Sequence, residues 1–109
     1  MRIDNIDKYN LGWLVGNFEP ALLHSNDIEI GIKYINAGDP VERHYQKVAT
    51  EYNYIVTGKV NANGSNLIAG DIFIYEPGEI TELKILEDTT IVVIKTPSLG
   101  YDDKVVCDD

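Results

Sequence analysis

The sequence predicts an all-β fold, a single-domain antiparallel β-barrel or sandwich. Apolar residues recur at every second position in most segments, turn signals separate those segments at short intervals, and no segment sustains the 3.6-residue spacing of a helix. At 109 residues, the chain has the length of one domain. Its 44% hydrophobic content is enough to bury a core without disulfide bonds.

The first clear strand is predicted over residues 28 to 36, which read IEIGIKYIN. An extended chain places Ile28, Ile30 and Ile32 on one face and Glu29, Gly31 and Lys33 on the other. This alternation is typical of a strand that is buried on one side only.

Further short strands follow as far as residue 96. The Asn-Gly pair within residues 61 to 66 supplies the positive φ of a tight hairpin, while Pro77-Gly78 and Glu87-Asp88 mark later turns. β-branched and aromatic residues, which pack well on a pleated surface, are concentrated in the segments HYQKV (44–48), EYNYIVTG (51–58), GDIFIY (70–75), ITELKIL (80–86) and TTIVVIKT (89–96).

These elements define a motif-bearing core at about residues 28 to 96 of a single domain that covers residues 1 to 109. The N-terminal arm, residues 1 to 27, contains Trp13, which belongs either to an edge strand or to a capping segment. The C-terminal tail covers residues 97 to 109, and we expect its acidic end, YDDKVVCDD (101–109), to be solvated.

Charge and hydropathy limit the classes of partner that the protein is expected to bind. Nine basic and eighteen acidic side chains give a net charge of −9, which repels a nucleic-acid backbone. The longest apolar run, Ile91 to Ile94, is too short to span a membrane, and the polar N-terminus does not resemble a signal peptide. The single cysteine, Cys107, is consistent with a reducing compartment. We therefore expect a cytoplasmic protein that binds neither nucleic acid nor membranes.

One constellation resembles a known motif. Gly38, His44, Gln46, Glu51 and Gly58 follow the spacing of the first cupin motif, Gly-x5-His-x-His-x(3,4)-Glu-x6-Gly, with glutamine in place of the second histidine. The resemblance implies a small single-domain cupin, whose fold is the double-stranded β-helix or jelly roll.

A second segment, GDIFIYEPGEIT (70–81), resembles the second cupin motif, but Thr81 occupies the position of its histidine. The resemblance implies a divalent transition-metal site made by His44, Gln46 and Glu51. Because Gln46 and Thr81 replace two histidines, we expect the metal to be weakly held or absent.

The spacing supports a shared site without reference to the family. Residues two apart on a strand point to the same side, so His44 and Gln46 project together, and Glu51 on the next strand can face them inside a barrel. We assign His44 and Glu51 as the candidate catalytic pair, with Glu51 raising the proton affinity of His44. Gln46, Asn53 and Thr81 are candidate ligand-binding residues.

Three functions remain open. The barrel binds a small polar, carbohydrate-like ligand and transforms it in the manner of an isomerase, epimerase or lyase; it binds a ligand without catalysis; or it is a structural barrel that dimerises. A homodimer is expected in each case. The positions of Gln46 and Thr81 distinguish these hypotheses. An enzyme needs both side chains to face a ligand pocket, whereas a structural barrel predicts a collapsed, filled interior. An inward-facing Lys95 could bind an anion, but the sequence favours a surface lysine.

Overall fold

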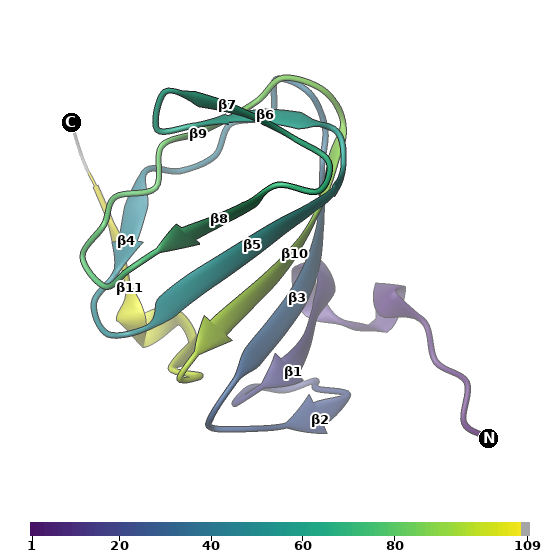
Figure 1. Cartoon of the computed structure of the whole chain (residues 1–109). Coiled ribbons are helices and arrows are strands. Elements are labelled where there is room, and N and C mark those ends of the chain that lie inside the picture. Colours follow the sequence, from purple (N-terminus) through teal and green to yellow (C-terminus); the bar gives the residue numbers. More distant parts are fainter. Residues whose placement is uncertain (108–109) are drawn as a thin grey trace.

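The computed structural model describes residues 1–107 and is built almost entirely from short strands (Figure 1). Six strands form the large sheet, in the order β2-β1-β3-β10-β5-β8, and two small sheets have the orders β7-β6-β9 and β11-β4. The strands are β1 (Trp13–Gly16), β2 (Leu23–His24), β3 (Glu29–Ile35), β4 (His44–Gln46), β5 (Thr50–Thr57), β6 (Lys59–Ala62), β7 (Ser65–Ile68), β8 (Ile72–Tyr75), β9 (Leu83–Ile85), β10 (Thr89–Thr96) and β11 (Lys104–Val106). Three 3-10 helices are η1 (Ile6–Lys8), η2 (Asn10–Gly12) and η3 (Gly100–Asp103). The all-β prediction is confirmed.

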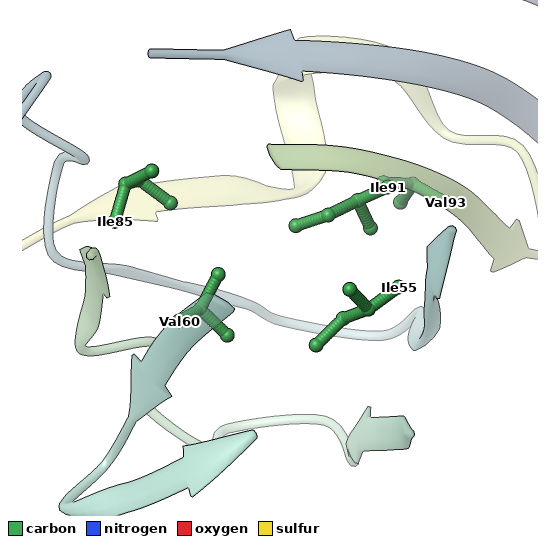
Figure 2. Packing of buried hydrophobic residues seen from close by; sticks show 5 residues of the cluster. All are labelled: Ile55, Val60, Ile85, Ile91 and Val93. Atoms are coloured by element: carbon green, nitrogen blue, oxygen red, sulfur yellow. The ribbon is translucent and has the colours of Figure 1, made fainter. Parts of the chain in front are cut away.

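The apolar core lies between the large sheet and the small sheet β7-β6-β9. Ile55, Ile91 and Val93 project from the large sheet and meet Val60 and Ile85 from the small one. Figure 2 shows these five side chains converging from β5, β6, β9 and β10. All five are nearly inaccessible to solvent, so this cluster is the main source of hydrophobic stabilisation among the described residues.

The inner face of the large sheet changes from apolar to polar along its strands. In the register of β3, β10, β5 and β8, one inward-facing row is made entirely of polar or ionisable side chains, namely Glu29, Lys95, Glu51 and Tyr75. The next inward row is Gly31, Val93, Asn53 and Phe73. Apolar packing therefore ends within the sheet, and a polar chamber begins.

Strand β3 buries the polar side of its alternating pattern. Glu29 is only 3% exposed and Gly31 is also buried, so Ile30 and Ile32 lie on the outer face of the sheet. Alternation in the sequence indicated a half-buried strand, and the partner strands determine that its polar side is the inner one.

The N-terminal arm contributes two strands to the large sheet. Strand β1 pairs antiparallel with β3, and β2 pairs parallel with β1, so Trp13 belongs to a strand inside the sheet and not to a cap. The indole packs over Gly31, where an added Cβ would lie 2.6 Å from Trp13 Cε3. A side chain at residue 31 would therefore displace the indole.

The C-terminal segment is ordered against the barrel as far as it is described, so the expectation of a solvated tail is wrong for its first part. Asp103 is 3% exposed, and its carboxylate accepts hydrogen bonds from the backbone N–H groups of Val48 and Ala49, each at 2.9 Å. Strand β11 then pairs antiparallel with β4. Residues 108 and 109, the end of the predicted tail and domain, lie outside the described part of the chain.

None of the helices formed by residues 1–107 is both long and apolar enough to cross a membrane.

Candidate functional site

A half-open cavity of about 1090 Å³ extends from the polar end of the barrel to the N-terminal 3-10 helices. The predicted site residues all line it: His44, Gln46, Glu51, Asn53 and Thr81. The structure thus brings together residues from β4, β5 and the segment before β9. Strand alternation predicted a shared interior for His44, Gln46 and Glu51, and the cupin resemblance added Thr81. The roles of these residues in binding or catalysis remain predictions.

Strand β4 carries His44 and Gln46 and is held on both edges. Its outer neighbour is β11, while the N–H of Thr81 donates a 2.7 Å hydrogen bond to the carbonyl of His44. The Nδ1 of His44 lies 2.8 Å from the carbonyl oxygen of Glu42. Because a carbonyl only accepts, Nδ1 carries the proton, and Nε2 of the neutral ring keeps a lone pair for a proton or a metal.

Gln46 is the most unusual residue of the cavity. It is 5% exposed, and neither Nε2 nor Oε1 has a hydrogen-bond partner among the residues that the structure describes. Leaving a buried polar group unpaired costs about 1–3 kcal/mol. The amide therefore carries one unsatisfied donor group and one unsatisfied acceptor beside the cavity, and both atoms are buried.

Glu51 and Asn53 are neighbours on the inner face of β5, 8% and 5% exposed. The Asn53 Nδ2 donates to Glu51 Oε2 at 3.2 Å and is 3.4 Å from the carbonyl oxygen of Phe73. Between His44 and Glu51, by contrast, no hydrogen bond or ion pair occurs within residues 1–107. The expectation that Glu51 acts directly on the His44 ring therefore has no contact to support it in this structure.

Tyr75 supplies a protonated phenol next to Glu51. Burial, followed by the negative charge of Glu51, raises the pKa of Tyr75 to about 12. Its hydroxyl donates to Asn63 Oδ1 at 2.8 Å. Tyr75 is thus a fixed donor at neutral pH. Nothing in the sequence distinguishes it from the other six tyrosines.

The cavity contains few strong metal ligands. No cluster of three or more histidine, cysteine, aspartate or glutamate side chains suited to a metal occurs within the described range. Glu82, next to Thr81, is directed outward and pairs with Arg43 at 2.9 Å, so it does not replace the missing ligand. One imidazole, one carboxylate and the unpaired amide oxygen of Gln46 fit a weakly held divalent ion.

Two lysines and the indole of Trp13 complete the wall of the cavity. The Nζ atoms of Lys33 and Lys95 lie 4.3 Å and 4.8 Å from the centroid of the indole ring. Lys95 forms an ion pair with Glu29 at 3.6 Å, and its side chain is 13% exposed. The sequence expectation of a surface lysine at position 95 is therefore wrong. Alternation along β10 could have predicted it, because Lys95 lies two residues after the buried Val93 and therefore shares its inner face.

The cavity strongly perturbs the pKa of Lys33. Burial, together with the positive charges of Lys95 and Lys104, lowers the pKa of Lys33 to about 8, while Glu51 and Glu29 act in the opposite direction. At neutral pH Lys33 is mostly protonated, but it releases its proton far more readily than an exposed lysine.

Comparisons with known proteins support the fold. No family model and no curated protein matches the sequence. An uncharacterised Klebsiella pneumoniae protein with a double-stranded β-helix domain is similar over 99% of this chain and 93% of its own, with a TM-score of 0.72 and 20% identity. KdgF from Halomonas sp. is similar over 71% of this chain and 74% of its own, with a TM-score of 0.65 and 20% identity.

The nucleoside dehydratase Pac13 is similar over 76% of this chain and 70% of its own, with a TM-score of 0.64 and 13% identity. At such low identities these likenesses establish the fold alone. The chain is a double-stranded β-helix with the jelly-roll architecture of cupins, as its two motifs predicted.

Replacing Gln46 with methionine should stabilise the protein. The two side chains have similar volumes, and the substitution removes a buried amide that has no partner, so we expect a gain of about 1–2 kcal/mol in the free energy of unfolding. Urea denaturation of the wild type and of Gln46→Met measures the difference. An unchanged or lower free energy for the variant would contradict the unpaired state of the amide.

Proposed function

We propose that the barrel binds a small polar, carbohydrate-like ligand in the cavity, with Gln46 as its central contact. The observation that carries this proposal is the buried Gln46 amide with both of its polar atoms unpaired. A primary amide offers a donor and an acceptor side by side, and neighbouring hydroxyl groups of a sugar can satisfy both. Binding would therefore remove a cost that the free protein carries.

The cavity itself argues against the purely structural hypothesis. A structural barrel predicts a collapsed and filled interior, whereas a chamber of about 1090 Å³ is lined by His44, Gln46, Glu51, Asn53 and Thr81. Small-molecule sites commonly combine apolar walls with a few convergent polar groups. Phe73, Leu83 and Val93 line the same chamber and provide such walls.

A catalytic version of this function assigns His44 Nε2 as the proton acceptor or donor. Its Nδ1–H is anchored on the Glu42 carbonyl, which orients the ring and keeps Nε2 available. Glu51 would be the second acid or base, held in place by Asn53, and Thr81 would contact the ligand. Isomerase, epimerase and lyase reactions need such proton transfers. The fold likeness to a nucleoside dehydratase is consistent with this class.

A divalent transition metal is the second element of the proposal. His44, Gln46 and Glu51 would hold it, and it would polarise a carbonyl or hydroxyl of the ligand. The set contains two strong donors, so affinity should be low compared with sites of three or four strong donors. The predicted cytoplasmic location is part of the same proposal, because a single cysteine, Cys107, is consistent with a reducing compartment.

Ligand binding is tested by thermal unfolding in the presence of neutral sugars and nucleosides. A ligand at one hundred times its Kd stabilises the native state by about 2.7 kcal/mol. We expect at least one compound to raise the Tm of the wild type but not that of Gln46→Met. His24→Ala is the matched control, because His24 is exposed on β2 and paired with Glu19. A compound that stabilises Gln46→Met as much as the wild type would place the site elsewhere, and no hit at all would count against the ligand class.

Metal binding is tested separately by elemental analysis of protein purified without an affinity tag and dialysed against a divalent transition metal. We expect up to one equivalent in the wild type and in His24→Ala, and loss of the metal in His44→Ala. Equal metal content in His44→Ala and the wild type would exclude His44 as a ligand. Protein that stays metal-free even with added metal would leave ligand binding as a metal-independent function.

The proposed homodimer uses the outer face of the large sheet. Two cross-strand rows on this face contain only apolar or aromatic side chains: Ile30, Ile94, Tyr52 and Ile74 in one, and Ile32, Val92, Tyr54 and Ile72 in the other. Several are well exposed, with Ile72 at 63% and Ile74 at 47%. Contiguous exposed apolar surface of this kind marks interaction sites.

A second copy of the chain is the occupant that this face fits best. Four strands and two residue rows cover on the order of 300 Å², which is the size of an apolar centre within an interface of about 800 Å² per partner. The rows carry no charge, so they offer nothing to a charged partner, while a twofold axis would place the two apolar faces against each other.

The dimer predicts a mass of twice the 12.2 kDa of one chain in solution. Tyr54→Lys places a charge at the centre of the face and should yield monomers, as measured by sedimentation equilibrium. Ile68→Lys is the control, because Ile68 is 58% exposed on the separate sheet that contains β7. A monomeric wild type, or a dimer that survives Tyr54→Lys, would contradict this interface.

A further inference from the structure

Lys33 lines the cavity, and the proposed function gives it no role. Its Nζ donates a 2.9 Å hydrogen bond to the carbonyl of Leu11 and lies beside the Trp13 ring. It lines the same cavity as Gln46. No carboxylate lies within ion-pair distance of this ammonium in the part of the chain that the structure describes.

The other two lysines of the cavity differ from Lys33 in this respect. Lys95 is paired with Glu29 at 3.6 Å, and Lys104 is paired with Glu42 at 2.9 Å. Both neighbouring cations act on Lys33 and disfavour its charge. Their own carboxylates are already engaged, so Lys33 is the ammonium with capacity left for an anion.

Both carboxylate oxygens of Glu29 already have partners. Its Oε1 accepts hydrogen bonds from the Ser98 hydroxyl at 3.0 Å and from the Gly100 N–H at 3.2 Å, while Oε2 faces Lys95. Glu51 is bound by Asn53. Both carboxylates still attract Lys33 over a longer distance, and they exclude an anion from their own part of the cavity.

We propose that Lys33 binds the anionic group of the ligand, so that the cavity takes a small polyhydroxylated acid whose hydroxyl groups contact Gln46. This inference rests on the proposed ligand binding and specifies its substrate class. An ammonium has three donors and no acceptor, and the Leu11 carbonyl occupies one of them. A carboxylate or phosphate monoester on the ligand would fill the others, with charge-assisted hydrogen bonds that are stronger than neutral ones.

The ion pair has a pH limit. Because the pKa of Lys33 is lowered to about 8 by burial and by Lys95 and Lys104, against the pull of Glu51 and Glu29, its ammonium is present at pH 7 and is lost above about pH 8. A bound anion stabilises the ammonium and moves this limit upward. Affinity for an acidic ligand should therefore fall as the pH rises from 7 to 10, whereas affinity for a neutral ligand should not follow the same curve.

The chain carries its own reporter for this test, because Trp13 is its one tryptophan and lies 4.3 Å from Lys33 Nζ. Its fluorescence is titrated at pH 7 with D-glucose, D-glucuronate and D-glucose 6-phosphate, which share a ring and differ at C6. We expect one of the two acids to bind more tightly than glucose. Lys33→Met should weaken that binding roughly tenfold or more, while Lys84→Met, which removes an exposed lysine on β9, should not.

Which acid binds identifies the anionic group as carboxylate or phosphate. The inference is overturned if glucose binds as tightly as both acids, if no acid binds, or if Lys33→Met binds the acid as the wild type does. Gln46→Met separates this failure from that of the proposed function. Binding that depends on Gln46 but not on Lys33 would support the proposed function and contradict the acidic ligand. Acid binding that depends on Lys33 but not on Gln46 would support the anion site and contradict Gln46 as the central contact. Circular dichroism of each variant verifies its fold.

Discussion

The organisation of the cavity depends on the position of Lys95 between two acidic residues in the centre of the large sheet. The register of β10 places Lys95 opposite Glu29 on β3 and opposite Glu51 on β5. A shift of β10 by one residue would turn Lys95 to the outer face and leave Glu29 and Glu51 inside without their shared cation. The pairing of β1 with β3 sets Trp13 opposite Gly31, which brings the indole within reach of both cavity lysines.

The barrel divides its strands between stability and binding. At one end, Ile55, Val60 and Ile91 are fully buried and supply the hydrophobic stabilisation that folding requires. At the other end, Gln46 and Lys33 are held in positions that burden the folded state, since one amide is unpaired and one ammonium is partly desolvated. Such groups are characteristic of sites whose partner arrives from outside the chain.

Sequence reasoning predicted the fold and the central residues of the cavity, because strand alternation and motif spacing are local properties. His44 and Gln46 are two residues apart, so their common direction does not depend on the rest of the fold. Lys33 and Trp13 could not be placed in this way. Ile30 and Ile32 of β3 suggest an inner face by themselves, but they lie outside, where the neighbouring strands β10, β5 and β8 also present apolar residues. Asp103 was missed for the same reason, since its backbone partners Val48 and Ala49 are distant in sequence.

A high-resolution crystal structure of the protein, grown with the acid that binds most tightly, would test the central claim directly. The account predicts ligand oxygens within hydrogen-bond distance of both polar atoms of Gln46 and an anionic group within ion-pair distance of Lys33 Nζ. A Gln46 amide paired with protein groups in an interior closed by its own side chains, with the acid bound elsewhere, would contradict it.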